Sequence, residues 1–223
     1  WEKPKFLGTE LKGKVLGIVG YGNIGQRVAE ICSTIGMKII TNSKSASDDD
    51  LSKFDVKKVS TEDLIKEADI VSLHTKLNDE TKYMINKNSL KKAKNDLVLI
   101  NTSRGGVLSE EDYLHSKDLF LISDVFEGEP NLSSKFCEKN YYFTPHIAGH
   151  SQFSRYAMTR MAFHNVADYL NIDVIEPESI LVNKEQNRIK ETINDFKNFL
   201  FPVSLILKTY NFTKDVFEPS LFK

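Results

Sequence analysis

The sequence has little of what marks a secreted, membrane-spanning or nucleic-acid-binding protein. Only 2 of its 223 residues are cysteines, which favours reduced thiols and a cytoplasmic setting, although one disulfide between Cys32 and Cys137 stays open. No apolar run approaches the roughly 20 residues that a bilayer-spanning helix needs, and the first residues do not resemble a signal peptide. The 30 basic and 31 acidic residues give a formal net charge of −1, so neither nucleic acid nor an anionic membrane is an expected partner.

What the sequence does contain is a series of short apolar segments that alternate with helical patterns. Continuous apolar runs are typical of strands buried on both faces, and their alternation with helices predicts an α/β fold with a doubly wound parallel sheet of the Rossmann type. The polar stretch at 43–50 is expected to be a loop. The expected strands cover 14–20, 37–41, 69–74, 97–101, 119–123 and 141–144, and the expected helices cover 23–35, 60–68, 88–93 and 109–116.

Two of the expected helices have recognisable ends. Ser60 opens the helix at 60–68 and Asp63 follows three residues on, which is a variant of the capping box. In the helix at 23–35, Gly36 acts as the stop. The apolar residues of that helix recur on one face, at Ile24, Val28, Ile31 and Ile35.

The stretch GYGNIG fits the pattern G-x-G-x-x-G, and it follows a strand and opens a helix. Gly20 permits the tight turn, Gly22 lets a pyrophosphate approach the backbone, and Gly25 lets the helix pack closely on the strand. The helix N-terminus, at Asn23 and Ile24, offers free N–H groups to the phosphates. This context predicts a dinucleotide site, and a glycine-rich turn without a ligand is the alternative.

The acidic residue that usually binds the ribose hydroxyls at the end of the second strand is missing. Ser43 and Lys44 stand in its place, and the acidic residues at 48–50 are expected to lie too far along the loop to replace it. A carboxylate would repel a 2′-phosphate, whereas a hydroxyl and an ammonium would accept one. The cofactor is therefore expected to be NADP or NAD, with NADP favoured; a solvated lysine without a role is the alternative.

Glycine-rich or polar motifs follow most of the expected strands. The carboxyl ends of parallel strands meet at one edge of a sheet, where ligands bind, so these motifs predict a single site. The motifs are Gly20–Gly25, Ser43–Lys44, His74–Thr75, Asn101–Arg104, Asp124–Glu129 and His146.

Five segments, in order, resemble the D-isomer-specific 2-hydroxyacid dehydrogenases, the family of phosphoglycerate, glycerate and erythronate-4-phosphate dehydrogenases. They are ELKGKVLGIVGYGNIG, ADIVSLHTKLNDETKYMIN, LINTSRGGVLSEEDYL, DVFEGEP and TPHIAG. The resemblance runs from Trp1 to about Asn183 and implies an oxidoreductase. Such an enzyme transfers a hydride between a nicotinamide cofactor and a small D-2-hydroxy or 2-keto acid, phosphorylated ones included, and is expected to be a homodimer. A non-catalytic, NAD(H)-sensing module of the corepressor kind on the same scaffold stays open.

The resemblance implies a catalytic trio of Arg104, Glu129 and His146. Reduction of a keto acid needs a proton for the new hydroxyl, and an imidazole titrates near neutral pH. A carboxylate beside the ring stabilises its protonated form and fixes its orientation, and a guanidinium binds a carboxylate with two hydrogen bonds. A structural role is the alternative for each residue.

The resemblance also implies further contacts with the cofactor. Asp124 corresponds to the residue that contacts the nicotinamide carboxamide. Of the two histidines in TPHIAGH, His150 is the weaker candidate for catalysis. His115 and His164 lie in helical patterns and are expected to be structural, and no histidine or cysteine has the spacing of a metal site. The implied cofactor-binding residues are His74, Thr75, Thr81, Thr102, Asp124 and Gly149.

These patterns divide the chain at about residue 150. We expect a dinucleotide-binding domain at 1–150 and a helical C-terminal segment at 151–223, with a long helix at 151–170 and a second amphipathic helix at 184–200. The C-terminal segment is expected to belong to an incomplete substrate domain or to a subunit interface. Family members carry a substrate-binding segment before the position of Trp1, so these 223 residues alone are expected to bind the cofactor but to turn over slowly.

Overall fold

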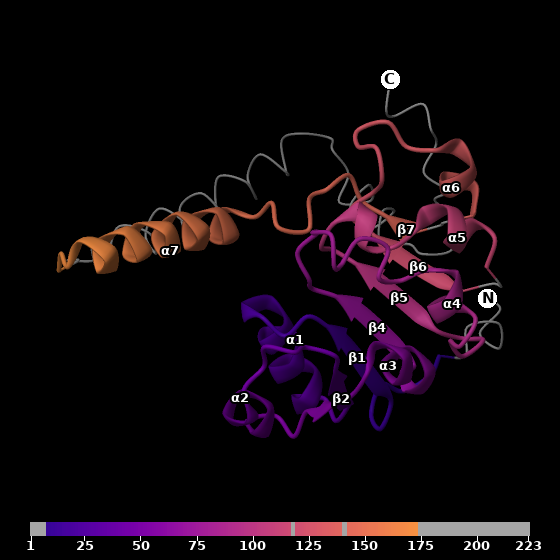
Figure 1. Ribbon diagram of the computed structural model, residues 1–223, viewed down its shortest axis with the longest axis horizontal. Coiled ribbons are helices and arrows are strands. Elements are labelled where there is room, and N and C mark those ends of the chain that lie inside the picture. Colours follow the sequence, from indigo (N-terminus) through magenta and orange to yellow (C-terminus); the bar gives the residue numbers. More distant parts are fainter. Residues whose placement is uncertain (1–7, 117–118, 140–141, 174–223) are drawn as a thin grey trace, which may run out of the picture. The chain divides into compact units, whose positions relative to one another are not determined.

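The computed structural model describes residues 8–116, 119–139 and 142–173, and the chain divides into two compact units between Ser151 and Gln152 (Figure 1). The first unit contains a seven-stranded sheet in the order β3-β2-β1-β4-β5-β6-β7, and every neighbouring pair is parallel. The expected doubly wound sheet is confirmed. The strands are β1 (Val15–Val19), β2 (Lys38–Thr41), β3 (Lys57–Lys58), β4 (Ile70–Leu73), β5 (Val98–Asn101), β6 (Phe120–Ser123) and β7 (Tyr142–Phe143).

Several helices of this unit begin at a serine whose hydroxyl accepts a hydrogen bond from a backbone N–H three residues on, which satisfies one of the free donors of the first turn. Ser47, Ser60 and Ser109 act in this way, and the predicted helix start at Ser60 is confirmed. The helices are α1 (Asn23–Thr34), α2 (Asp48–Ser52), α3 (Thr61–Glu67), α4 (Lys87–Leu90), α5 (Glu110–Leu114) and α6 (Ser134–Lys139), with a 3₁₀ turn at Gly105–Val107.

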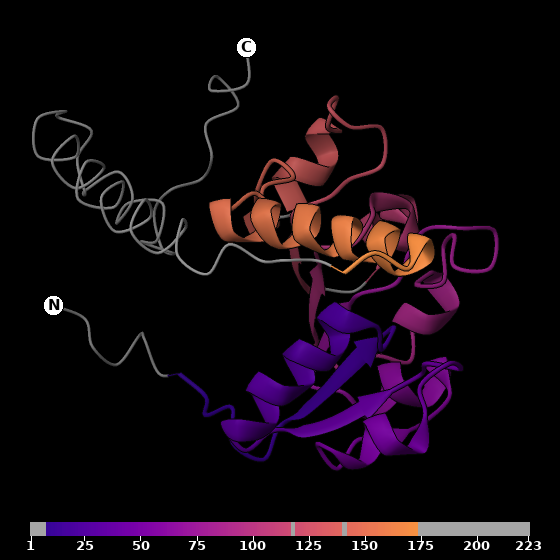
Figure 2. The same ribbon diagram turned by 90° about the vertical axis from the view of Figure 1, so that its left-hand side faces the viewer.

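Two clusters of buried apolar side chains lie on opposite faces of the sheet, because successive side chains of a strand point to opposite sides. The larger cluster joins β1, β2, β4, β5 and β6 to α3, α4, α5 and α6. The smaller cluster joins β1 and β2 to α1 and α2, and Figure 2 shows α1, in indigo, alongside the first two strands. Gly17 allows α3 to pack closely on β1, because an added Cβ at Gly17 would lie 2.5 Å from Leu64 of α3.

The structure corrects three details of the sequence-based prediction. Most of the apolar face predicted for α1 is exposed, at Ile24, Ile31 and Ile35, because α1 packs through its small residues Gly25 and Ala29 instead. The stretch at 43–50 is not entirely a loop, since α2 begins at Asp48. The short β3 and α6 were not predicted, and they contain 2 and 6 residues.

Among the described residues, the two sides of strand β6 differ in burial. Leu121 is 2% exposed and belongs to the larger cluster, whereas its neighbour Phe120 is 58% exposed and belongs to neither cluster. Ile122, which points to the same side as Phe120, is also exposed. This side of β6 therefore presents apolar side chains outside both clusters.

The second unit contains α7 (Gln152–Leu170), so the long helix expected at 151–170 is confirmed. Most of its described side chains are exposed, including Tyr156, Met161 and Tyr169. The second helix expected at 184–200 lies outside the described residues. In the described part of the chain, no helix combines the length and hydrophobicity that crossing a membrane requires.

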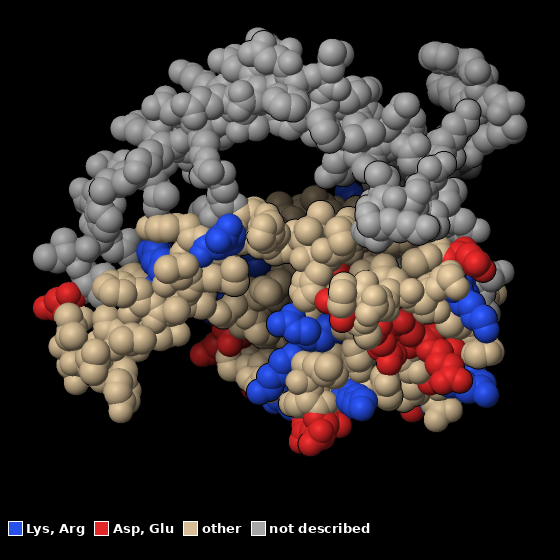
Figure 3. Space-filling model, turned by 90° about the horizontal axis from the view of Figure 1, so that it is seen from above, with Lys and Arg blue, Asp and Glu red and all other residues tan. Residues whose placement is uncertain are grey.

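The surface charges agree with the balanced composition. Figure 3 shows Lys and Arg (blue) and Asp and Glu (red) on the same face, among a larger area of other residues. The described part of that face therefore carries charges of both signs.

Cys32 and Cys137 are both free, and burial raises the pKa of each thiol. The disulfide left open by the sequence is therefore not formed.

Candidate active site

The motifs expected at one edge of the sheet do follow the ends of its strands. Because all seven strands are parallel, their carboxyl ends lie along the same edge. The strands β1, β2, β4, β5, β6 and β7 end at Val19, Thr41, Leu73, Asn101, Ser123 and Phe143, each within three residues of the motif that follows it.

The three glycines of the turn after β1 differ in what the fold requires of them. Gly20 has a φ of +89°, and an added Cβ there would lie 2.8 Å from the carbonyl oxygen of His74. At Gly25 an added Cβ would lie 2.3 Å from the carbonyl oxygen of Gly20. At Gly22 it would meet no atom within 4 Å. The fold therefore explains Gly20 and Gly25, whereas Gly22 faces open space and is not required by the packing.

The start of α1 has the features of an anion-binding site. Gly22 is the N-cap residue and provides no side-chain hydrogen bond, and the first bond within the helix runs from Gln26 N to Gly22 O over 2.9 Å. The N–H groups of Asn23 and Ile24 precede that bond and lie at the positive end of the helix dipole. This arrangement can hold a phosphate or pyrophosphate.

The first three residues after β2 include no carboxylate. Ser43 is largely buried, with its hydroxyl 3.4 Å from that of Ser45, and Lys44 is exposed. The ammonium of Lys58 donates to the carbonyl oxygen of Lys44 over 3.2 Å. Asp50 is occupied within α2, where its carboxylate accepts from Lys53, and this hydrogen bond lowers the pKa of Asp50.

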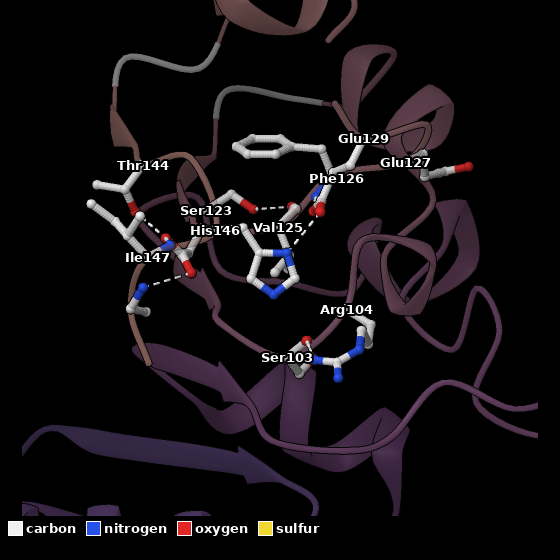
Figure 4. A network of polar contacts seen from close by, with 12 residues as sticks. Ser103, Arg104, Ser123, Val125, Phe126, Glu127, Glu129, Thr144, His146 and Ile147 are labelled. Atoms are coloured by element: carbon white, nitrogen blue, oxygen red, sulfur yellow. Dashed lines mark hydrogen bonds and ion pairs between the residues drawn. The ribbon is translucent and has the colours of Figure 1, made fainter. Parts of the chain in front are cut away.

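Arg104, Glu129 and His146 line one open cavity of about 330 Å³. The three residues come from the segments that follow β5, β6 and β7. Figure 4 shows the ring of His146 between the turn that carries Glu129 and the segment that carries Arg104. The structure thus brings together the three residues that the sequence singled out.

One hydrogen bond fixes the ring of His146. Its Nδ1 lies 2.7 Å from Oε2 of Glu129, while Oε1 of Glu129 accepts from the backbone N–H of Phe126 over 2.7 Å. Nε2 has no hydrogen-bond partner among the described residues, and the side chain is 50% exposed. The ring is therefore held at one nitrogen and can exchange a proton with a ligand at the other.

The loop that carries His146 is held by Asp124, which is only 3% exposed. The carboxylate of Asp124 accepts from the hydroxyl of Thr144 and from the backbone N–H groups of Ile147 (2.8 Å) and Ala148 (2.9 Å). Its carbonyl oxygen accepts from His146 N over 2.9 Å. His146 itself has a φ of +55°, a left-handed conformation that costs energy outside glycine. Asp124 thus has a local structural role that the sequence did not reveal.

Arg104 reaches the cavity because the next residue is glycine. An added Cβ at Gly105 would lie 2.0 Å from the carbonyl carbon of Phe126, so the segment after β5 packs directly on the turn after β6. The side chain of Asn101 donates to the carbonyl oxygen of Arg104 over 3.1 Å and fixes the turn. The guanidinium is exposed and donates to the carbonyl oxygen of Ser103.

A pair of carboxylates that the sequence did not single out supports the same turn. Glu110 N donates to the carboxylate of Glu127 (2.8 Å), and Glu127 N donates to the carboxylate of Glu110 (2.6 Å). The hydroxyl of Tyr83 also donates to Glu127, over 2.8 Å, and this bond raises the pKa of Tyr83. Burial raises the pKa of Glu110, and the negative charges of Glu127 and Glu129 add to the effect.

Two of the other candidates have their polar groups engaged locally. His74 Nε2 lies 2.8 Å from the hydroxyl of Ser72, and burial lowers the pKa of His74, so its ring is neutral at neutral pH. The hydroxyl of Thr81 donates to the carbonyl oxygen of Lys76 over 2.6 Å and closes the loop that begins there. The cofactor contacts expected of both residues stay predictions.

The remaining candidates lie near the same edge or away from it. Thr102 and Gly149 are exposed, and Thr75 is half-buried. His150 does not line the cavity. His115 caps α5, with its ring on the carbonyl oxygen of Glu111. In the described ranges, no three His, Cys, Asp or Glu residues are grouped as a metal site would require.

Residues 1–148 match the family model described as the NAD binding domain of D-isomer specific 2-hydroxyacid dehydrogenases. The chain is 36% identical over 201 residues to a glyoxylate reductase from Aeropyrum pernix, covering 86% of this chain and 58% of that protein. It is 39% identical over 155 residues to a hydroxypyruvate reductase from Thermotoga maritima, covering 66% and 50%. The crystal structure of apo D-mandelate dehydrogenase from Rhodotorula graminis matches with a TM-score of 0.66 at 27% identity, covering 72% and 49%. The chain thus spans about half the length of the curated relatives it matches.

Proposed function

The chain belongs to the family of D-isomer specific 2-hydroxyacid dehydrogenases, and we propose that the protein that carries it is a working member. It reduces a small 2-keto acid to the D-2-hydroxy acid with a nicotinamide cofactor, or catalyses the reverse oxidation. The observation that carries this proposal is the hydrogen bond between Glu129 and His146 on a cavity that Arg104 also lines.

His146 is the proton donor of the reduction. With Nδ1 bound to Glu129, Nε2 faces the ligand and gives its proton to the keto oxygen, which becomes the new hydroxyl. In the oxidation the same nitrogen accepts the proton. Glu129 keeps the ring in place and stabilises its positive charge in the protonated state.

Arg104 binds the carboxylate of the keto acid. A guanidinium offers two parallel N–H groups to a carboxylate, and its charge does not depend on pH in the physiological range. The carboxylate is then fixed beside His146, which places the neighbouring keto oxygen within reach of Nε2.

The turn after β1 holds the pyrophosphate of the cofactor at Gly22, Asn23 and Ile24, where the fold leaves space and free N–H groups. A nicotinamide cofactor supplies the hydride of the reduction. We assign further contacts with the cofactor to the edge residues Ser43, Lys44, His74, Thr75, Thr81, Thr102, Asp124 and Gly149. One acceptor position of the Asp124 carboxylate is left for a nicotinamide carboxamide, since three of about four are used.

We further propose that NADP is preferred over NAD. Lys44 is exposed at the end of β2, the ammonium of Lys58 lies beside its carbonyl group, and the nearby Asp50 is paired with Lys53. A 2′-phosphate there would meet positive charge rather than a carboxylate. The same family membership leads us to propose that residues 1–150 form the dinucleotide-binding domain and that the protein is a homodimer.

A steady-state assay of the protein that carries this chain tests the proposal, with hydroxypyruvate and glyoxylate as substrates and with NADH and NADPH in turn. We expect turnover with at least one keto acid and a higher kcat/KM with NADPH. Tight dinucleotide binding without turnover of either keto acid would contradict the proposal and would favour a cofactor-sensing role.

A further inference from the structure

We propose that Tyr83 is a positioning residue, whose hydroxyl fastens the turn that carries Glu129 and so determines how firmly Glu129 holds the ring of His146. This inference rests on the proposed function and deepens it. Tyr83 lines the same cavity as Glu129 and His146, but it comes from another part of the chain, the segment between β4 and α4.

The turn that carries Glu129 depends on contacts from outside it. Residues 127–130 belong to no helix or strand. Within the turn region, Oε1 of Glu129 accepts from Phe126 N over 2.7 Å, which fixes the carboxylate relative to its own backbone. This bond does not fix the turn relative to the loop of His146. The position of the Glu129 carboxylate therefore follows the position of the whole turn.

Glu127 provides the outside contacts, and it lies two residues before Glu129. One of its carboxylate oxygens accepts from the Tyr83 hydroxyl over 2.8 Å, and the other accepts from Glu110 N over 2.8 Å. In Figure 4 this carboxylate points away from the ring of His146. Glu127 is thus held at both oxygens by two different segments, and Tyr83 is its partner from the segment between β4 and α4.

Tyr83 is itself held in place. Its N–H donates to Gly106 O over 2.8 Å, and Ile85 N donates to Val107 O over 3.1 Å, so the segment runs alongside the residues that follow Arg104. Tyr83 has a φ of +51°, which bulky residues seldom adopt. Such strain persists where the surroundings over-determine the backbone, and it is concentrated at functional sites. The hydroxyl is therefore presented to Glu127 from a fixed backbone.

The hydroxyl acts through Glu127 and not as an acid of the reaction. Its proton is donated to the Glu127 carboxylate, and this bond raises the pKa of Tyr83, so the phenol stays neutral at neutral pH. Tyr83→Phe consequently removes a hydrogen bond without removing a charge. The charged side chains of the cavity and of the loop that carries His146 all remain in this variant, namely Lys82, Arg104, Asp124, Glu127 and Glu129.

The pKa of His146 therefore reports the position of Glu129 in this variant. A carboxylate beside an imidazole stabilises the protonated ring, so a turn that has moved away lowers the pKa of His146. The reduction uses the protonated ring. The high-pH limb of the profile of kcat against pH should then move to lower pH. A role in stability alone would lower the melting temperature and leave this limb in place.

The test compares the wild type with Tyr83→Phe in the protein that carries this chain. We expect kcat of the reduction at neutral pH to fall by about 3- to 10-fold, the range of one hydrogen bond. The pKa of His146 should fall by about 0.5–1 unit, the same factor expressed as a pKa. It is measured by NMR titration of the ring signals that are missing from His146→Gln. The dissociation constant of the dinucleotide should stay the same.

Tyr169→Phe is the matched control, because it removes an exposed hydroxyl from α7, outside the cavity. It should change neither kcat nor the pKa of His146. A pKa of His146 that stays the same or rises in Tyr83→Phe would overturn the inference, and so would an equal shift in Tyr169→Phe.

A double variant tests whether Tyr83 acts through Glu127. The kcat of Tyr83→Phe combined with Glu127→Gln should be no lower than that of the more damaged single variant. Losses that multiply would show two independent effects and would overturn the inference. If no keto acid is turned over, the proposed function fails instead. The NMR titration needs no substrate and then decides alone, since a lowered pKa of His146 in Tyr83→Phe supports the inference and an unchanged one overturns it.

Discussion

At the scale of single residues, the orientation of His146 depends on one carboxylate. Glu129 is bound to Nδ1 of the ring at 2.7 Å and is itself fixed by the N–H of Phe126. The neighbouring carboxylate Glu127 is directed to Tyr83 and Glu110 instead. Two carboxylates on the same short turn therefore make separate contacts, Glu129 with the ring of His146 and Glu127 with Tyr83 and Glu110.

Glu129→Gln should lower kcat by about 10- to 100-fold, because a hydrogen bond to a charged group contributes about 1.5–3 kcal/mol and each 1.36 kcal/mol is tenfold in rate. The dissociation constant of the dinucleotide, measured by fluorescence titration, should not change. Glu127→Gln is the matched variant and should affect kcat less. Equal losses in the two variants would contradict a specific role for Glu129.

The stability of the protein should depend on pH through Glu110, whose pKa is raised by burial and by Glu127 and Glu129. The folded state therefore holds this proton more tightly than the unfolded state. The stability that Glu110 contributes is present below the unfolded pKa of about 4.3 and is lost as the pH rises through the folded pKa.

Glu110→Gln keeps an acceptor for the N–H of Glu127 but cannot ionise. The melting temperature of the wild type should therefore fall relative to that of Glu110→Gln as the pH rises from about 4 to 7. Thermal unfolding of both proteins across this range measures the difference. A constant difference between the two melting temperatures across this pH range would show that Glu110 has the same pKa in the folded and unfolded states.

The sequence predicted the residues that converge on the cavity but not the contacts that hold them. Arg104, Glu129 and His146 each follow a strand, and parallel strands bring such residues to one edge. The carboxylate exchange between Glu110 and Glu127 depends on the exact approach of two turns, which no spacing encodes.

At the scale of elements, the turn between β1 and α1 offers one glycine that the fold requires and one that we propose is needed by the ligand. Gly25→Ala places a Cβ 2.3 Å from Gly20 O and should lower the free energy of unfolding by about 1–3 kcal/mol. Gly22→Ala meets nothing within 4 Å and should cost about 1 kcal/mol or less. It should nevertheless weaken dinucleotide binding by roughly tenfold or more, at least about 1.4 kcal/mol.

Denaturant unfolding and dinucleotide titration of the two variants provide the comparison. A Gly22→Ala protein that binds the dinucleotide as tightly as the wild type would place the pyrophosphate elsewhere. A Gly25→Ala protein with full stability would show that α1 can move away from β1 without cost.

Strand β6 offers a second matched pair, because adjacent residues point to opposite sides. Leu121→Ala should cost about 2–5 kcal/mol of unfolding free energy, since this side chain is fully buried. Phe120→Ala should cost less than about 1 kcal/mol, because the side chain is 58% exposed. Equal losses in denaturant unfolding would mean that this side of β6 is covered in the protein.

The elements themselves were largely predictable, and each error has its own local cause. Glycine and serine at helix ends mark boundaries that do not depend on tertiary contacts, as at Ser60 and Gly36. The packing face of α1 was predicted wrongly because the prediction followed the spacing of the large apolar residues. The residues of α1 that are buried are the small Gly25 and Ala29. A strand as short as β3 has too few residues to show a period.

At the scale of the whole molecule, the first unit carries both parts of the proposed chemistry. The dinucleotide turn follows β1, and the cavity with its three candidate catalytic residues follows β5, β6 and β7 at the same edge. The chain spans about half the length of its curated relatives. The measurement that matters most is therefore one that separates cofactor binding from the chemical step.

That measurement is the rate of hydride transfer in a single turnover, for the wild type and for His146→Gln, with the dinucleotide and the keto acid both saturating. We expect the rate to fall by about 10²- to 10⁴-fold, as the loss of a general acid requires, while the dissociation constant of the dinucleotide stays the same. An unchanged rate of hydride transfer in His146→Gln would contradict the account.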